Sequence, residues 1–511
     1  MSNNSQSSFD VVIVGAGLSG IGMAVHLQRE CPGKTYTILE SRKSIGGTWD
    51  LFRYPGVRSD SDMHTLGYDF KPWREAKSIA DGPSIRHYVR ETAAEYGLDR
   101  HIQFGRKLIA AEWVTEHSRW TLQVERPGSG KIEEISCNFL QMCSGYYNYD
   151  DAFDPQIPGT ADFKGQLVKP QFWPEDLDYS GKRVVVIGSG ATAMTVVPSM
   201  ADKAAKVTMV QRSPTYVASR PDQDKIANTL RKILPEMLAY RLTRFKNTRL
   251  QKYMYDKTRT APDRVKSLLL NEVRRHLGPD YNVDKHFTPT YNPWDQRLCL
   301  IPNADLFASI KQGKTEMVTG HIERITATGL QMRDGTQIEA DILVLATGLN
   351  LLLLGGAQFV VDGEPVDFPN TVSYKGMMYS DVPNMVQTFG YINASWTLRA
   401  DLTSEYVCRV LNHMDRLGVA QCTPRLRPNE VNAPRRPWIE NFSAGYMQRL
   451  MHLYPRQLAT DPWRNTQDFA LDKKMLRHAP LEDGALVFGR PAVVKKGARG
   501  ATIRGQAASA G

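Results

Sequence analysis

Two glycine-rich turns of the same type stand 173 residues apart in this chain, GAGLSG at residues 15–20 and GSGATA at residues 188–193. Each turn follows a short apolar stretch, residues 11–14 or 184–187, and precedes residues typical of a helix. A strand, a glycine turn and a helix in this order present backbone N–H groups at a helix N-terminus to a pyrophosphate. The duplication therefore predicts two nucleotide cofactors that meet in one protein.

The residues after the second strand of each unit predict which nucleotide binds where. In the first unit, residues 35–39 form an apolar strand that leads to Glu40, twenty residues past Gly20. A carboxylate there accepts hydrogen bonds from unphosphorylated ribose hydroxyls, which suits FAD or NAD. In the second unit, residues 207–210 lead to Gln211, Arg212 and Ser213, so a guanidinium replaces the acid. Arg212 suits the 2′-phosphate of NADPH.

The order of these elements predicts an α/β fold with two Rossmann-like dinucleotide-binding domains, the first for FAD or NAD and the second for NADP, and a helical insertion in the NADP domain. A strand over residues 341–345 leads to a small-residue turn at 346–348, and residues 108–123 alternate like antiparallel strands. The predicted organisation is a first part of the FAD (or NAD) domain (1–146), a linker and first NADP part (147–222), the helical insertion (223–296), a second NADP part (297–348), a second part of the FAD (or NAD) domain (349–490) and a disordered basic tail (491–511).

Cysteine usage and hydropathy limit the classes of protein. Six cysteines, at positions 31, 137, 143, 299, 408 and 422, show no CxxC pair and no metal-ligand spacing, so we predict reduced thiols, no metal site and a cytoplasmic protein. This pattern also argues against a disulfide reductase. Residues 342–361 carry no charge, but Gly and Asn interrupt them, so we predict buried core rather than a membrane span. The polar start, residues 1–10, does not resemble a signal peptide.

The net charge of +10 is concentrated in two segments, residues 224–275 and the tail at 490–511, which holds 5 basic residues and no acid. Residues 224–275 hold 14 Lys and Arg against 5 acids, with apolar residues at helical spacing (Ile226, Leu230, Ile233, Leu234, Met237). These residues predict amphipathic helices with a basic outer face. A solvated face is the favoured interpretation, and peripheral membrane contact is the alternative. No nucleic-acid-binding motif accompanies the charge, so nucleic acid is not expected as a partner.

Three sequence features together resemble the class B flavoprotein monooxygenases: the pair of glycine turns, the ATG turn at residues 346–348 and the loop GGTWDLFRYPGVRSD at residues 46–60. Within that class the chain is similar to the Baeyer–Villiger monooxygenases, and most to their ethionamide-activating branch. The loop at 46–60 agrees with the family's pattern at each fixed position. The segment YNPWDQRLC at residues 291–299 resembles the family's active-site arginine segment, which points to Arg297.

This resemblance implies a reaction. NADPH would reduce FAD, O₂ would add to give a C4a-peroxyflavin, and ketones would become esters or lactones, with sulfoxidation of thioethers or thioamides as a second activity. Arg297 would supply a permanent positive charge to the anions, and Asp60 would orient it. Asn393 and Trp396 would lie on the substrate side, although Trp396 is equally well explained as a core aromatic residue.

The resemblance also implies which residues hold the two cofactors. The residues expected to contact FAD are Gly15, Gly17, Ser19, Gly20, Glu40, Gly47, Thr48, Trp49, Asp60 and Leu108. The residues expected to contact NADP are Arg58, Ser59, Gly188, Ser189, Gly190, Ala191, Thr192, Ala193, Arg212 and Ser213.

The chain departs from the family in the linker. The family pattern FxGxxxHxxxW is matched by Phe163, Gly165 and Trp173, but Lys169 replaces the histidine. Lysine keeps a charge but loses the ring's acceptor nitrogen, so the change either uncouples turnover to hydrogen peroxide or is tolerated. The alternatives are therefore a flavin-containing N- or S-monooxygenase, or an uncoupled NADPH oxidase. A second departure is Gln296, where many relatives carry lysine, and it predicts weaker selection of NADPH over NADH.

Overall fold

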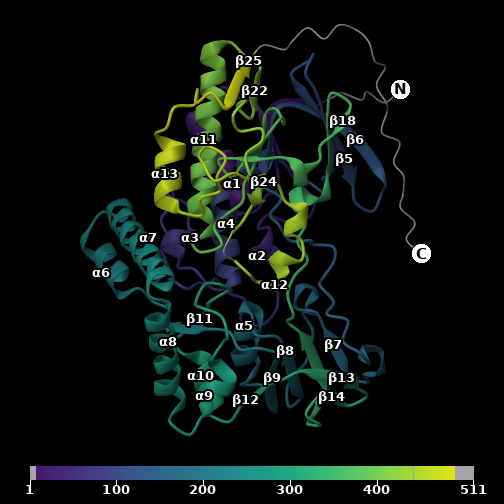
Figure 1. Cartoon of the computed structure of the whole chain (residues 1–511), viewed down its shortest axis with the longest axis vertical. Helices are drawn as coiled ribbons and strands as arrows, with labels where there is room; N and C mark the ends of the chain where they lie inside the picture. Colours follow the sequence, from purple (N-terminus) through teal and green to yellow (C-terminus); the bar gives the residue numbers. More distant parts are fainter. Residues whose placement is uncertain (1–6, 441, 490–511) are drawn as a thin grey trace.

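Two sheets form the centre of the protein in this computed structural model, which describes residues 7–440 and 442–489 (Figure 1). The first, nine-stranded sheet has the order β18-β17-β4-β5-β6-β1-β2-β3, with β21 paired to β6. Its strands are β1 (Ser7–Val14), β2 (Tyr36–Glu40), β3 (Ile102–Phe104), β4 (Lys107–Val114), β5 (Arg119–Arg126), β6 (Lys131–Met142), β17 (Gln358–Val361), β18 (Glu364–Pro365) and β21 (Met385–Gln387).

The second sheet has five strands, all parallel, in the order β12-β9-β8-β16-β7. They are β7 (Gln166–Val168), β8 (Arg183–Ile187), β9 (Lys206–Gln211), β12 (Thr315–Thr319) and β16 (Ile342–Leu345). Smaller sheets join β10 (Val217–Arg220) to β11 (Cys299–Pro302), β13 (Ile322–Thr326) to β14 (Gly329–Met332) and β15 (Gln337–Glu339), β19 (Ser373–Tyr374) to β20 (Met378–Tyr379), β22 (Gln421–Pro424) to β25 (Leu486–Gly489), and β23 (Arg436–Pro437) to β24 (Arg456–Gln457).

Helices cover both sheets. They are α1 (Leu18–Glu30), α2 (Thr48–Leu51), α3 (Met63–Leu66), α4 (Gly82–Glu95), α5 (Ala191–Met200), α6 (Lys225–Ile233), α7 (Glu236–Thr260), α8 (Pro262–Leu277), α9 (Val283–Phe287), α10 (Asp305–Lys311), α11 (Trp396–Leu417), α12 (Gly445–Gln448) and α13 (Phe469–Arg477). In Figure 1, α1, α11 and α13 lie in the upper half, α5, α9 and α10 in the lower half, and α6 and α7 project at the side.

The predicted α/β fold class is confirmed, and both glycine turns lie where a parallel strand meets its helix. In the first unit, β1 pairs with β2 in parallel, with Val11 opposite Tyr36, and residues 11–14 of β1 are apolar and buried. In the second unit, β8 pairs with β9 in the same way, with Val184 opposite Val207. The second strand of the first unit spans residues 36–40, one residue later than the predicted 35–39, so that Glu40 is its last residue.

The chain leaves the first sheet after β6, forms the second sheet, and returns to the first sheet with β17, β18 and β21. The predicted antiparallel strands within residues 108–123 are confirmed as β4 and β5. The uncharged stretch 342–361 is β16, irregular chain and β17, and no helix among the described residues is long and apolar enough to cross a membrane. All six cysteines are buried and unpaired. The predicted disorder of residues 491–511 lies outside the described residues.

Candidate active site

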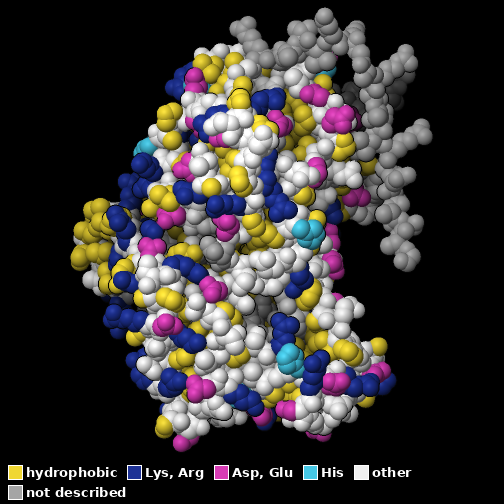
Figure 2. Space-filling model, in the orientation of Figure 1, with side chains coloured by type: hydrophobic (Ala, Val, Ile, Leu, Met, Phe, Trp, Pro, Cys, Tyr) yellow, Lys and Arg dark blue, Asp and Glu magenta, His cyan; other side chains and the backbone are white. Residues whose placement is uncertain are grey.

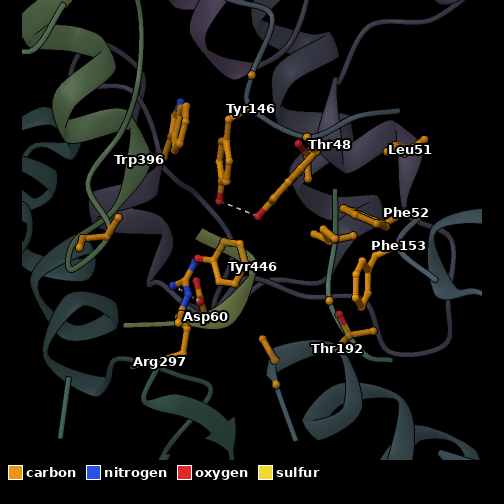
Figure 3. Close-up of a pocket in the computed structure, with 18 of the residues that line it drawn as sticks. Thr48, Leu51, Phe52, Asp60, Tyr146, Phe153, Thr192, Arg297, Trp396 and Tyr446 are labelled. Carbon is orange, nitrogen blue, oxygen red and sulfur yellow. Dashed lines mark hydrogen bonds and ion pairs between the residues drawn. The ribbon is translucent and has the colours of Figure 1, made fainter. Parts of the chain in front are cut away.

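One large cavity of about 1330 Å³ is lined by residues of both glycine turns. Figure 3 shows part of its wall, with Thr192 of the second turn and the pair Asp60 and Arg297. Its wall includes Gly15, Gly17 and Ser19 of the first turn and residues 188–192 of the second. The loop that ends at Asp60, the segment that carries Arg297, and residues 391–396 complete its wall. Two nucleotide sites and a candidate reaction centre therefore share one space.

Glu40 closes the first nucleotide site at the end of β2. Its buried carboxylate accepts the backbone N–H of Ala16 and that of Arg42, both at 2.8 Å. Each carboxylate oxygen can accept a further hydrogen bond, so the group remains able to bind ribose hydroxyls. Leu108, at the start of β4, also lines this part of the cavity. Gly20 does not line it: a Cβ there would stand 1.8 Å from the oxygen of Gly15, so glycine lets α1 pack on its own turn.

The two glycine turns fit a dinucleotide, because glycine at two of their positions has no other explanation. No protein atom lies within 4 Å of the place that a Cβ of Gly190 would take, and Gly17 would meet only Gly47, at 3.5 Å. Their φ angles, −82° and −84°, are open to any residue. A side chain at either position would instead obstruct the N-terminus of α5 or α1, where a pyrophosphate binds.

The residues predicted for NADP fall into two groups. Arg212 and Ser213 are exposed at the end of β9 and line the cavity, and Arg212 forms no ion pair or hydrogen bond with another described residue. Arg58 also lines the cavity, but its guanidinium binds the Asp305 carboxylate at 2.5 Å. The Ser59 hydroxyl donates to the carbonyl of Ser61 at 2.7 Å. Arg212 is thus free to bind a phosphate, whereas Arg58 and Ser59 already have protein partners.

The remaining predicted nucleotide contacts are distributed between the cavity wall and the structure behind it. Ala191 and Thr192 line the cavity, and Ala193 is buried in α5. Thr48 and Trp49 open α2 and line the cavity together with Gly47.

Arg297 and Asp60 meet in the cavity although 237 residues separate them, with Arg297 Nη1 3.1 Å from Asp60 Oδ2. Their side chains are 32% and 41% exposed, so both charges face the cavity rather than the core. Burial lowers the pKa of Arg297, but the neighbouring Tyr446 hydroxyl and Asp60 carboxylate outweigh it and hold this pKa well above its usual value. The pair provides a permanent cation whose orientation is fixed by one carboxylate (Figure 3).

Trp396 connects the predicted substrate side with the first nucleotide site. Its ring stacks on that of Tyr146, with 5.3 Å between centroids and 13° between planes, and its Nε1 donates to Ser19 Oγ at 2.8 Å. Trp396 therefore both packs against the core and lines the cavity, as two alternative interpretations of the sequence had it. Asn393 lines the cavity near it and donates from Nδ2 to the carbonyl of Gln467 at 3.0 Å.

The linker residues lie outside the cavity wall. Gly165 must be glycine, because a Cβ would stand 2.4 Å from the oxygen of Asp341. Trp173 is buried, and Phe163 packs against the core of the second sheet. Lys169, in the position of the family histidine, donates to Asp154 Oδ2 at 3.0 Å. The backbone N–H of Gln156 and the Lys169 ammonium lower the pKa of Asp154.

Three aromatic or basic residues of the site were not predicted. Tyr146 follows β6, and its position at the carboxyl end of a parallel strand was a usable signal. Tyr446 and Arg449 come from the α12 region, and Arg449 lies over the Phe153 ring, 3.8 Å from its centroid. No motif or periodicity marks the α12 region in the sequence.

Comparisons with known proteins give the family and the fold of this chain. The family described as FMO-like, flavin-binding monooxygenase-like, matches residues 9–353. The chain is 52% identical over 487 residues to the FAD-containing monooxygenase EthA of Mycobacterium tuberculosis H37Rv, covering 95% of this chain and 99% of the relative. It is 45% identical over 486 residues to the probable FAD-binding monooxygenase AlmA of Acinetobacter baylyi, covering 95% and 97%. A steroid monooxygenase structure with bound NADP has a TM-score of 0.76 at 22% identity, covering 95% of this chain and 100% of the other.

Proposed function

Because the chain belongs to the flavin-binding monooxygenase-like family, which confirms the resemblance found in its sequence, we propose that it is an NADPH-dependent FAD monooxygenase of the Baeyer–Villiger type. It converts ketones into esters or lactones with O₂. The observation that supports this most is the Asp60–Arg297 pair in the cavity that both glycine turns line. When bound, FAD and NADPH supply the hydride transfer and oxygen activation.

The protein's own residues bind and orient the reactants. The N-termini of α1 and α5 hold the two pyrophosphates, Glu40 holds the FAD ribose, and Arg212 holds the 2′-phosphate of NADPH. Arg297 places a fixed positive charge beside the reacting oxygen atoms, where negative charge develops, and a guanidinium remains protonated throughout. Asp60 keeps that guanidinium in one orientation, and the stacked Tyr146 and Trp396 rings exclude water from one wall.

Sulfides form a second substrate class, because a nucleophilic sulfur needs no cation to stabilise a developing oxyanion. We therefore expect ketone oxygenation to depend on Arg297 much more strongly than sulfoxidation. A flavin-containing N- or S-monooxygenase is the alternative function, and it predicts sulfoxidation without ester formation. An uncoupled NADPH oxidase is the other alternative, which the replacement of the linker histidine by Lys169 supports.

The test is to measure NADPH consumption, ester and hydrogen peroxide in the same reactions, with the FAD-loaded protein and a simple methyl ketone. We expect ester in step with NADPH for the wild type. Arg297→Ala should abolish ester formation and leave flavin reduction measurable, and Arg264→Gln, an exposed guanidinium on α8, is the matched control. Ester formation by Arg297→Ala at near the wild-type rate would disprove the role of Arg297. Peroxide without ester from the wild type would favour the oxidase.

We also propose that α6 and α7 bind the surface of an anionic membrane. An outer apolar stripe runs along both helices at helical spacing: Ile226, Ile233, Leu238, Leu242, Phe245 and Tyr253, which are 44–69% exposed. Figure 2 shows apolar side chains gathered where Figure 1 places α6 and α7. The exposed Lys232, Arg241, Arg249 and Lys257 adjoin the stripe. These cations would repel each other across an interface between two copies, whereas anionic headgroups neutralise them.

Vesicle sedimentation tests this surface. The wild type should sediment with phosphatidylcholine vesicles that contain phosphatidylglycerol, and much less with phosphatidylcholine alone. Leu242→Glu with Phe245→Glu should abolish sedimentation, while Leu268→Glu, an exposed leucine on α8, should not. Absence of binding to both vesicles would refute the proposal. A dimer that the double variant dissociates would identify a second copy of this chain as the occupant instead.

A further inference from the structure

Helix α7 contacts the chain on both sides of the Asp60–Arg297 pair. Asp60 is followed two residues later by Asp62, which begins α3, and Arg297 is preceded two residues earlier by Asp295. Side chains on one face of α7 form hydrogen bonds with both of these short segments. The opposite face carries the outer apolar stripe, so the inner contacts are separate from the proposed membrane surface.

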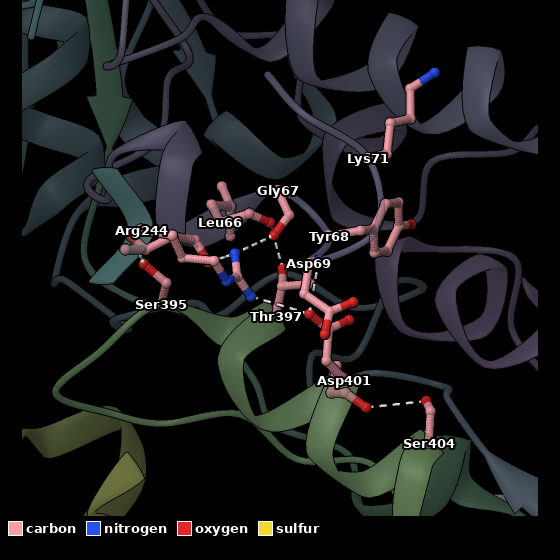
Figure 4. Close-up of polar contacts among 12 residues, drawn as sticks. Leu66, Gly67, Tyr68, Asp69, Lys71, Arg244, Ser395, Thr397, Asp401 and Ser404 are labelled. Carbon is pink, nitrogen blue, oxygen red and sulfur yellow. Dashed lines mark hydrogen bonds and ion pairs between the residues drawn. The ribbon is translucent and has the colours of Figure 1, made fainter. Parts of the chain in front are cut away.

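The first contact is made by Arg244 (Figure 4). Its Nη1 donates to the backbone carbonyls of Gly67 at 2.7 Å, His64 at 3.1 Å and Thr65 at 3.2 Å. Its Nη2 donates to Asp401 Oδ2 of α11 at 3.0 Å. The Arg244 side chain is 13% exposed and that of Asp401 4%, so this charge pair is firmly enclosed. Arg244 thus joins α7 to the end of α3 and to α11.

The second contact fixes the start of α3. Asn247 donates from Nδ2 to Asp62 Oδ1 at 3.0 Å, and Gln251 donates from Nε2 to Asp62 Oδ2 at 3.2 Å. Asp62 also caps α3 by accepting the N–H of Thr65 at 3.2 Å. The Asp62 carboxylate is therefore bound both by the amides of α7 and by the backbone of α3, and these bonds fix the backbone that leads back to Asp60.

The third contact is at the far end of α7. Arg259 donates from Nη1 to Asp295 Oδ1 at 2.7 Å and from Nη2 to the carbonyl of Pro293 at 3.4 Å. Asp295 Oδ2 accepts the N–H of Asn292 at 3.1 Å, which closes the turn before Arg297. Arg259 therefore holds the segment that presents Arg297.

From these contacts we infer that α7 is the positioning element for the catalytic pair, and that Arg244 and Arg259 are positioning residues that set the distance between Asp60 and Arg297. The two arginines are fifteen positions apart on one continuous helix, a rigid span of about 22 Å. A rigid helix keeps the two segments that it contacts at a fixed separation, whereas each loop alone would leave its charged residue free to move. The inference rests on the proposed function in taking Arg297 as the catalytic cation.

Arg259 is the better residue to change, because its side chain is 29% exposed and its loss leaves a partner that water can reach. Removing Arg244 would take one of two neighbouring cations from the enclosed Asp401 carboxylate, which His26 also approaches at 3.9 Å, and threaten folding. We compare Arg259→Gln and Arg259→Lys with Arg264→Gln as the matched control. The wild type and these three variants are studied with FAD bound, in the same ketone assay.

We expect Arg259→Gln to lower kcat for ester formation about tenfold and to raise the share of NADPH lost to peroxide, with an unchanged KM for NADPH. Arg259→Lys should restore part of kcat. Because Arg297→Ala is expected to make no ester, the rate of NADPH oxidation is compared in that background, and Arg259→Gln should change this rate less than twofold. A tenfold fall of NADPH oxidation in the Arg297→Ala background as well, or a fall in thermal stability that accounts for the whole effect, would overturn the inference.

Backbone amide exchange separates this inference from the proposed function. Arg259→Gln should speed exchange in residues 291–298, and Arg264→Gln should not. If the wild type makes no ester, the proposed function fails, yet this exchange result would still support the positioning of Arg297 by α7. Unchanged exchange in residues 291–298 would overturn it.

Discussion

Arg212 offers a direct test of how the second nucleotide is selected. We consider Arg212→Gln, which keeps a polar side chain of similar length but removes the positive charge. The residue is exposed at the end of β9, lines the cavity and has no ion-pair or hydrogen-bond partner among the described residues. The substitution therefore changes little within the protein itself and acts on the bound nucleotide.

The size of the effect follows from that environment. Hydrogen bonds to charged groups contribute about 1.5–3 kcal/mol, and exposure places this one toward the lower part of that range. A loss of about 2 kcal/mol weakens binding about 30-fold. Gln296, which also lines the cavity, adds no second charge that would compensate. NAD⁺ has no 2′-phosphate, so its affinity should stay within about twofold.

Equilibrium titration of the FAD-loaded protein with NADP⁺ and NAD⁺ measures both affinities, and Arg333→Gln on the exposed turn after β14 is the control. The wild type should lose NADP⁺ affinity as salt rises, and the variant should lose less, because salt screens exposed charges. A variant that binds NADP⁺ within threefold of the wild type would refute the role of Arg212. An equal weakening of NADP⁺ and NAD⁺ would show damage to the site instead.

Two further predictions concern charged side chains outside the cavity. Lys169→Ala and Asp154→Ala should each lower the free energy of unfolding by at most about 1 kcal/mol, because the ion pair between these side chains is partly exposed. The ratio of ester formed to NADPH consumed should change less than twofold in Lys169→Ala. A larger change would show that Lys169 takes part in turnover. Burial lowers the pKa of His26, but Asp401 and Glu30 outweigh it and raise this pKa to about 10. Protonated His26 therefore stabilises the fold fully below pH 6.5, and this stabilisation is lost as the pH rises through 10. The free energy of unfolding should fall between pH 6.5 and pH 10 by on the order of a few kcal/mol. Chemical denaturation of His26→Gln should show a flatter pH dependence, and an equal slope would contradict the assignment.

The sequence was most informative where local chemistry determines structure. The glycine turns, the strands before them and the position of Glu40 depend on residues within one strand–turn–helix unit, and the fold class followed from their order. The meeting of Asp60 and Arg297 was expected from the family pattern, and the structure brings them to 3.1 Å.

Contacts between distant irregular segments could not be predicted. Arg58 was expected to face the nucleotide and lines the cavity, but its ion pair with Asp305, 247 residues later, was not foreseen. Tyr446 enters the cavity from a short helix without periodicity, and Arg259 reaches Asp295 at the end of a helix whose sequence indicates only a basic surface. Such pairs depend on how whole helices and loops pack against one another, and neither residue spacing nor secondary-structure propensity predicts that packing.

The return of the chain to its first sheet has a consequence for biosynthesis. Strand β21 completes β6, and α11 packs against α1, but the ribosome makes both partners only after the entire second sheet. At a synthesis rate of about 5–20 residues per second, the apolar surfaces of β6 and α1 remain uncovered for on the order of tens of seconds. The nascent amino-terminal half should therefore be a client of chaperones, and truncation before residue 417 should yield insoluble protein rather than a smaller flavoprotein.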